Sequence, residues 1–115
     1  MEKNQLREDS ISFAIAVSDV CEDIKGCAVF INQLIRSSSS IGANIHEARY
    51  AQSRADFISK LEIALKESSE TDYWLELLYR KGKITADDYK TLRNDCGSIR
   101  RRLIASITTA KENRP

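Results

Sequence analysis

The sequence predicts an all-α protein folded as an antiparallel, up-down-up-down four-helix bundle. Its 115 residues include only one proline and four glycines, and an all-β protein needs more turns than these supply. Apolar residues recur at spacings of three and four along four segments, which is the period of helices with a buried face. Links of about two to six residues join the segments, so neighbouring helices run antiparallel. We therefore expect a single domain over residues 1–115, frayed at about 1–8 and 111–115.

The first helix is expected over residues 10–25, and it has two apolar stripes. One stripe consists of Phe13, Val17, Val20 and Ile24, and the other of Ile11, Ala14, Ile15 and Ser18. A helix that is apolar on two sides must bury both of them. The sequence therefore contains more apolar helix surface than one bundle covers. Gly26 is expected to end this helix.

The second helix is expected over residues 28–52, although its middle favours helix poorly. Its apolar spacing is that of Ile31, Leu34, Ile41, Ile45 and Ala48. Residues 37–44, in one-letter code SSSSIGAN, disfavour helix by roughly 3–4 kcal/mol relative to alanine when their intrinsic propensities are summed. Taken alone they are compatible with a loop, but the apolar period continues in phase through them. We predict that they are helical and that contacts with a neighbouring helix stabilise them.

A capping pattern opens the third helix, because Ser53 is followed three residues later by Asp56. The apolar stripe of this helix consists of Ile58, Leu61, Leu65, Ser68, Leu75 and Leu78. Lys81 in the last turn and Gly82 just beyond it are typical of a helix end.

Thr85 and Asp88 repeat the capping pattern for the fourth helix, which is expected to reach about Ala110. Its stripe consists of Tyr89, Leu92, Cys96, Ile99, Leu103, Ser106 and Ala110. Alternating spacings of three and four along this stripe predict the packing of antiparallel bundles.

The compartment predicted from the sequence is the cytoplasm. Cys21, Cys27 and Cys96 are odd in number and form no C-x-x-C pair, so we expect free thiols in a reducing environment. Residues 1–9 are charged and lack the apolar core of a signal peptide. No run approaches the roughly 18 apolar residues that a membrane span requires. We therefore expect a soluble protein that does not bind membranes.

The sequence offers little for metal or nucleophilic chemistry, so no enzyme activity is expected. A di-iron centre in a bundle needs Glu-x-x-His on two helices, but the chain has one histidine, His46, preceded at three residues by Ala43. His46-Glu47 begins a zinc-protease motif in which Tyr50 replaces the second histidine. Neither a nucleophile elbow nor a P-loop spacing occurs. We expect no catalytic residue, no metal and no cofactor, and we place His46 at the surface or an interface.

Polar residues form a constellation on the second and third expected helices. The second helix carries Arg36, Ser40, Asn44 and Glu47, and the third carries Glu67, Glu70, Thr71 and Trp74. Spacings of three and four place each set on one side of its helix. One interpretation is a solvated face, and the other is a polar network at a contact between helices or subunits. In the second case Arg36 pairs with Glu67 or Glu70, and removing one partner costs roughly 3–5 kcal/mol.

The charge of the chain is distributed unevenly. The formal net charge is only +1, which by itself gives no reason to expect nucleic-acid binding. Residues 79–115, however, carry ten basic and four acidic side chains, a local charge of +6. The candidate nucleic-acid contacts in this part are Lys90, Arg93, Arg100, Arg101 and Arg102.

These basic residues do not all share one face. The three consecutive arginines splay at steps of 100°, whereas Lys90, Arg93, Gly97 and Arg101 lie more nearly together. Gly97 leaves room for a phosphate backbone, and no aromatic residues interleave with the arginines, so base stacking is not supported. A contact would therefore be made to phosphate and would depend on salt. The alternative is an ordinary soluble face balanced by neighbouring acids.

Two stretches of the sequence resemble a known signature. They are residues 33–48, QLIRSSSSIGANIHEA, and residues 56–67, DFISKLEIALKE, continuing to Glu70 and Tyr73-Trp74-Leu75. Together they resemble the 23S rRNA-intervening-sequence proteins, a bacterial four-helix bundle family often encoded inside insertions in 23S rRNA genes. The accessory protein of diversity-generating retroelements is similar in kind. The resemblance covers nearly the whole chain.

The resemblance implies a homopentamer of bundles arranged as a tapered ring, without enzyme activity. It implies a role in fold and assembly for Arg36, Ser40, Asn44, Glu47, Glu67 and Glu70. In the retroelement relatives, a strongly basic surface is linked to the binding of RNA, DNA and a reverse transcriptase.

Two hypotheses about function follow. The first is a non-catalytic ring that binds structured RNA or DNA through the arginines of the fourth helix, with five copies adding avidity. The second is an oligomeric adaptor that recruits a protein, such as a reverse transcriptase, without touching nucleic acid.

Overall fold

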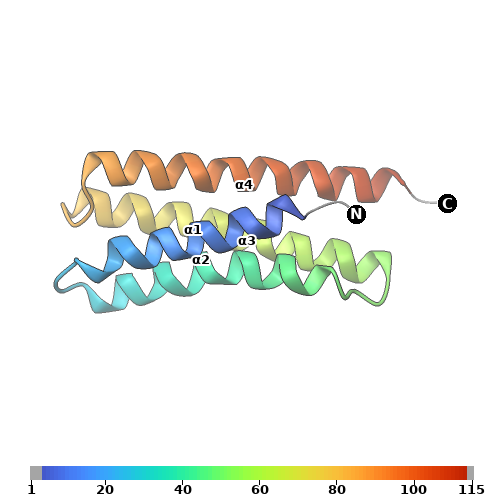
Figure 1. The fold of residues 1–115 in the computed structure, drawn as a ribbon, viewed down its shortest axis with the longest axis horizontal. Helices are drawn as coiled ribbons and strands as arrows, with labels where there is room; N and C mark the ends of the chain where they lie inside the picture. Colours follow the sequence, from blue (N-terminus) through green and yellow to red (C-terminus); the bar gives the residue numbers. More distant parts are fainter. Residues whose placement is uncertain (1–3, 114–115) are drawn as a thin grey trace.

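The computed structural model describes residues 4–113, and in this range it contains four helices and no strand. They are α1 (Gln5–Glu22), α2 (Ala28–Ala48), α3 (Arg54–Arg80) and α4 (Ala86–Glu112). Figure 1 shows them side by side, each running opposite to the one before it, in a rod of 51 × 23 × 21 Å. Each helix packs against two neighbours, most extensively for α2 with α3 and least for α1 with α4. The predicted all-α class with four helices is confirmed.

The start of α1 differs from the sequence prediction. The helix begins at Gln5 and not at Ser10, so residues 5–8, which were expected to be frayed, are helical. The cause is Asn4, whose side-chain oxygen accepts a hydrogen bond from the backbone N–H of Arg7 at 3.1 Å and thereby caps the first turn. Residues 1–3 lie outside the described range.

The helix ends also differ by a few residues. α1 ends at Glu22 and not at Lys25, and α2 ends at Ala48, four residues before the predicted end. In the opposite direction, α4 continues through Lys111 to Glu112, which were expected to be frayed. Residues 114–115 lie outside the described range. The periodicity of apolar side chains predicts the buried face of a helix more accurately than it predicts the last residue, because helix ends depend on capping contacts.

The predicted starts of α3 and α4 are confirmed by their caps. The hydroxyl of Ser53 accepts a hydrogen bond from the N–H of Asp56 at 3.0 Å, and that of Thr85 accepts one from Asp88 at 3.1 Å. After α3, Gly82 has a φ of 75°, which is the left-handed conformation that commonly ends helices.

The core follows the predicted stripes with a few exchanges. On α4, Ile107 is buried where the sequence predicted Ser106, and on α3, Ala64 and Thr71 are buried while Leu65 is only half-buried. A helix of 27 residues drifts relative to a strict alternation of three and four, because its true period is 3.6. Such drift moves the buried face by one residue along a long helix.

The serine-rich segment is helical, as predicted, and two of its serines are buried. Ser37 is 0% exposed and Ser38 is 2% exposed. Their hydroxyls donate to the backbone carbonyls three residues earlier, at 3.3 and 3.2 Å. On α3, the hydroxyl of Thr71 lies 2.9 Å from Ser37 Oγ and 2.8 Å from the carbonyl of Glu67, so it donates to one of them at a time. Within residues 4–113 no buried side-chain nitrogen or oxygen lacks a hydrogen-bond partner.

Gly42 is the point of close approach between α1 and α2. A Cβ atom at this position would lie 2.9 Å from Ser10 Oγ and 3.4 Å from Ser10 Cβ. Ser10 itself is 0% exposed, and its hydroxyl donates to the carbonyl of Arg7 at 2.7 Å. Because this contact leaves no space for a methyl group, glycine is required here by packing.

We predict that Gly42→Ala lowers the free energy of unfolding by about 1 kcal/mol. Overpacking typically costs 1–3 kcal/mol, which exceeds the gain of about 1 kcal/mol that alanine brings to a helix. Urea unfolding measures the difference. In a Ser10→Ala background, where the clashing oxygen is absent, the same substitution should cost much less.

The control is Gly97→Ala on α4, whose new Cβ would meet only the guanidinium of Arg101, at 3.3 Å. This substitution should stabilise the protein by about 0.5–1 kcal/mol. Equal effects of the two glycine substitutions would contradict the close contact between α1 and α2.

Candidate nucleic-acid interface

A polar groove of about 520 Å³ runs between α3 and α4. Its lining consists of Ser69, Asp72, Arg93, Asn94, Cys96, Gly97, Arg100 and Arg101. Three of the five predicted nucleic-acid contacts, Arg93, Arg100 and Arg101, thus lie around one concave surface. They gather there because residues 93, 97 and 100 follow helical spacing on the side of α4 that faces α3.

The groove is positively charged but contains one acid. Arg93 is half-exposed, and its Nε lies 3.6 Å from Asp72 Oδ1 on α3. Three arginines and one aspartate give the lining a net charge of +2. Arg100 and Arg101 are exposed. The groove therefore presents guanidinium groups to solvent, and these groups can bind an anion such as phosphate through paired N–H donors.

The space beside Gly97, which was expected to admit a phosphate backbone, is bordered by a side chain of the protein itself. The nearest group to the position of a Cβ at Gly97 is Nη1 of Arg101, at 3.3 Å. The space expected for a phosphate backbone is thus bordered by the guanidinium of Arg101, which lies across the glycine. The absence of a side chain at Gly97 leaves room for this guanidinium.

Arg102 and Lys90 lie outside the groove. Arg102 turns toward α1, where its Nη1 donates to Asp9 Oδ2 at 2.8 Å, and its Nε donates to the carbonyl of Ser98 at 3.4 Å. It links the two least extensively packed helices, so its position favours a structural role over the predicted contact with nucleic acid. Lys90 is exposed and is not part of the groove lining.

An aromatic pair adjoins the basic residues, which the sequence analysis did not expect. Tyr89 was assigned to the core stripe, but it is only half-buried and stacks on Tyr79 with ring centroids 4.2 Å apart and planes at 3°. The guanidinium carbon of Arg93 lies 5.8 Å from the Tyr89 ring centroid. The spacing of four between Tyr89 and Arg93 was a signal in the sequence, whereas the approach of Tyr79 from α3 was not.

Arg36 on α2 joins two carboxylates of α3. Its Nη1 lies 3.3 Å from both oxygens of Glu67, its Nη2 contacts Glu70, and its Nε donates to Gln33 at 3.0 Å. The indole N–H of Trp74 donates to Glu70 at 3.1 Å. The structure thus brings Arg36, Glu67 and Glu70 together across the contact between α2 and α3.

This network is exposed enough to change the expected energy. The hydrogen bond from Trp74 lowers the pKa of Glu70 and Arg36 adds to this effect, whereas partial burial opposes it. The bond to Glu70 raises the pKa of Arg36. The Arg36 side chain, however, is 47% exposed and that of Glu70 is 35% exposed. Glu67, the other partner, is 17% exposed. Because Arg36 and Glu70 reach solvent, and pairs exposed to solvent contribute about 0–1 kcal/mol, we expect a smaller cost than the roughly 3–5 kcal/mol of a fully buried pair.

The other predicted members make separate contacts. Asn44 donates to the carbonyl and hydroxyl of Ser40, at 2.9 and 3.3 Å, within α2. Glu47 pairs with Lys60 of α3 at 3.4 Å. These residues lie on the same side of α2 as Arg36, but their contacts are with Ser40 and Lys60.

The comparisons with known proteins agree with this architecture. The family model of 23S rRNA-intervening sequence proteins matches residues 2–105. The chain belongs to this family. It is also similar to the crystal structure of a protein of unknown function from the S23 ribosomal protein family of Bacteroides thetaiotaomicron VPI-5482. The sequences are 46% identical, the TM-score is 0.85, and the match covers 89% of this chain and 97% of the other. A comparison with curated proteins found no match.

The remaining titratable groups of this family member are dispersed. In the described part of the chain, no cluster of three or more His, Cys, Asp or Glu residues has the arrangement of a metal site. His46 is exposed, and its Nδ1 accepts a hydrogen bond from Nε of Arg7 at 3.1 Å. Burial raises the pKa of Cys96 to about 12, so this thiol stays protonated. No helix within residues 4–113 has the length and apolar character needed to cross a bilayer.

We predict that Arg36→Ala lowers the free energy of unfolding by at most about 1 kcal/mol at pH 7. The pKa of Glu70 is lowered in the folded state. Its ionised carboxylate therefore stabilises the fold fully above the pKa of the unfolded state, about 4.3, and this stabilisation is lost as the pH falls through the pKa of the folded state. The difference in the free energy of unfolding between the native protein and Arg36→Ala should therefore become smaller at acidic pH. Urea unfolding at pH 7 and pH 3 measures it.

The matched control is Arg80→Ala, which breaks the exposed pair of Arg80 with Glu76 on α3 and should cost about 0.3–0.5 kcal/mol. A loss of 3 kcal/mol or more in Arg36→Ala would restore the interpretation as a buried ion pair.

Proposed function

We propose that the protein is a non-catalytic nucleic-acid-binding protein that contacts the phosphates of structured RNA or DNA through the groove between α3 and α4. The observation that carries this proposal is the convergence of Arg93, Arg100 and Arg101 around one concave surface. Ser69 and Asn94 add neutral polar groups to the same lining.

The chemistry of the groove suits phosphate better than other ligands. Arginine presents two parallel N–H donors to two oxygens of a phosphate group. Asp72 already engages Arg93 at 3.6 Å, so a phosphate must compete for that side chain, whereas Arg100 and Arg101 are exposed. Phosphate contacts position a nucleic acid without specifying its sequence. The binding should therefore depend on shape and on salt.

The names of the relatives support RNA as the first polyanion to test. The family is described as 23S rRNA-intervening sequence proteins, and the solved relative is assigned to the S23 ribosomal protein family. Both names refer to the ribosome, and neither describes an activity. They give a reason to test fragments of structured rRNA before other ligands.

Self-association would strengthen such a modest site. On α1, Ile11 and Ile15 are 40% and 56% exposed, so the second apolar stripe is left open by the single chain. Burying it against another copy removes apolar surface from water. We propose a ring of identical subunits, with the pentamer expected from the family resemblance. Several grooves on one ring would raise the affinity through avidity.

An adaptor function is the second candidate, and exposed apolar residues outside the groove favour it. Val29 and Tyr50 are each 71% exposed and Tyr73 is 58% exposed. Aromatic residues at a surface are typical of protein interfaces. In this case the ring would recruit a protein, such as the reverse transcriptase suggested by the retroelement relatives, and the groove would not contact nucleic acid.

We predict that binding to a structured rRNA fragment weakens steeply with salt. Each phosphate contact contributes a slope of about −0.7 to −0.9 to log K against log salt. Replacing Arg93, Arg100 and Arg101 by alanine should therefore reduce the slope by roughly 2 to 3 units per subunit and weaken binding at low salt. Filter binding at a series of salt concentrations measures both quantities.

The matched control removes three other exposed charges, with Lys25, Arg80 and Lys81 replaced by alanine. This variant has the same net charge but an intact groove, so its slope should stay near that of the native protein. An equal loss of affinity and of salt slope in both variants would contradict binding in the groove. If the native protein retains no RNA on the filter at low salt, the adaptor function is favoured.

We predict that the native protein sediments as an oligomer at micromolar concentration, and that Ile11→Glu with Ile15→Glu converts it to a folded monomer. The new charges cannot be buried in an apolar contact without a large desolvation cost. Ile63→Glu on α3, where the isoleucine is 41% exposed, is the control and should leave the oligomer intact. A native protein that sediments as a monomer would refute the ring.

A further inference from the structure

A cleft of about 760 Å³ lies at the end of the bundle near the described start of α1. α1 has 18 residues, whereas α3 and α4 have 27 each, so α1 is shorter than α4 by about 13 Å at 1.5 Å per residue. Arg102 of α4 pairs with Asp9, and the cleft lies beyond this level, along residues 105–113 of α4. Among residues 4–113, the cleft is lined by α2, α3, α4 and the link between α2 and α3, and by no residue of α1.

Small side chains make the cleft deeper. Its lining consists of Ala48, Arg49, Ala51, Ser53, Arg54, Phe57, Ala105, Ser106, Thr109, Ala110 and Asn113. Elsewhere the core is filled with leucine and isoleucine, but four of these eleven positions are alanine. Phe57 is half-buried and supplies an aromatic surface. The described residues thus leave an open space with an apolar part at this end.

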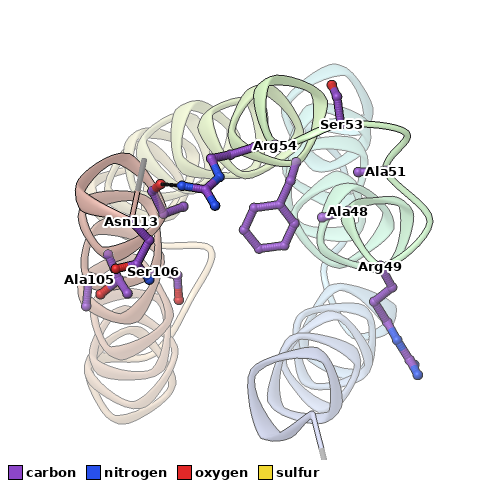
Figure 2. A pocket seen from close by; sticks show the side chains of 11 residues that line it. Ala48, Arg49, Ala51, Ser53, Arg54, Ala105, Ser106 and Asn113 are labelled. Carbon is purple, nitrogen blue, oxygen red and sulfur yellow. Dashed lines mark hydrogen bonds between the residues drawn. The ribbon is translucent and has the colours of Figure 1, made fainter. Parts of the chain in front are cut away.

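The charged residues of the lining are two arginines, and none of its eleven residues is acidic. Figure 2 shows Arg54 reaching from the start of α3 across the cleft toward α4, where its Nη1 donates to the carbonyl of Ala110 at 3.4 Å. This bond is long, so the guanidinium keeps further donors for a ligand. Arg49 is exposed at the end of α2, and Figure 2 shows its side chain directed away from Arg54.

We propose that this cleft binds a small amphipathic anion, with its apolar body between the alanines and Phe57 and its carboxylate against Arg54. The volume lies in the range of about 300–1,000 Å³ that is typical of small-molecule sites. An apolar lining with the cation of Arg54 across it suits a medium-chain fatty acid or an aromatic carboxylate. The site is separate from the groove of Arg93, Arg100 and Arg101 and does not depend on nucleic-acid binding.

The test uses decanoate, with 1-decanol and decylammonium as probes of equal chain length. Each is titrated against the protein carrying the fluorescent anion anilinonaphthalene sulfonate. Decanoate should displace the dye with one site per chain and should bind about tenfold more tightly than the alcohol, because a carboxylate pairs with arginine. Decylammonium should bind more weakly still. Equal binding of the acid and the alcohol would overturn the role of Arg54.

Two variants, each with a matched control, locate the site. Arg54→Gln should reduce the affinity for decanoate to about that of decanol and leave decanol unchanged, whereas Arg80→Gln, which alters an exposed arginine at the far end of α3, should change neither. Ser106→Leu fills the cleft from α4 and should abolish binding of both probes. Thr91→Leu is its control, because Thr91 is exposed on α4 outside the lining.

Circular dichroism and thermal unfolding test whether each variant is folded. If Ser106→Leu does not fold, Thr109→Leu replaces it, since Thr109 is an exposed residue of the same lining. Binding of decanoate that survives filling of the cleft would refute the site. Failure of the native protein to bind decanoate, with a change of sedimentation in the filled variant, would assign the cleft to a second copy of the chain instead.

Discussion

The packing of the serine-rich part of α2 against α1 and α3 is the constraint on which the rest of the structure depends. Its intrinsic cost, roughly 3–4 kcal/mol for residues 37–44, is offset by burial. Leu34 and Ile41 are both 0% exposed, and each contributes about 1.5–3 kcal/mol when removed from water. The hydroxyls of Ser37 and Ser38 donate hydrogen bonds to backbone carbonyls of the preceding turn. Their burial therefore leaves neither hydroxyl without a hydrogen-bond partner.

A second contact between small residues, of α3 with α4, lies beside the basic groove. On α3 and α4, Ser68 is 0% exposed and Cys96 is 2% exposed, and the thiol of Cys96 donates to the carbonyl of Ser68 at 3.4 Å. The next residue on each helix, Ser69 and Gly97, lines the groove. Because the core contact brings α3 and α4 together through short side chains, the arginines of α4 meet the surface of α3 beside it. The core packing thus determines which polar residues face one another.

The sequence predicted the helices and most of the core because both follow from local periodicity and capping. Ser53 and Thr85 identified two helix starts correctly, whereas Asn4 was overlooked because its partner, the N–H of Arg7, precedes the first apolar stripe. The pairing of Arg36 with α3 followed from its position on the helix, but its exposure did not. Exposure depends on what covers a side chain from other helices, and single-sequence patterns do not contain that information.

The separation of the arginines on α4 was only partly predictable for a similar reason. Steps of 100° indicated that Arg100, Arg101 and Arg102 diverge, but not that Arg102 meets Asp9 of α1. The cleft at the end of the bundle was not predicted either. It arises from a difference in length between α1 and its neighbours, and that difference became visible only when the helices were placed beside one another.

The near-zero net charge is compatible with a polyanion ligand because charge acts locally in this molecule. At physiological salt the screening length is about 8 Å, which is far shorter than the 51 Å length of the bundle. A phosphate in the groove is therefore influenced by Arg93, Arg100, Arg101 and the competing Asp72, and little by the acids of distant helices. Weak long-range attraction also limits unspecific binding. A single groove with a charge of +2 would hold a nucleic acid weakly, so the proposed binding needs several grooves acting at once. The proposed ring would supply them, because identical sites on one assembly add their contacts through avidity.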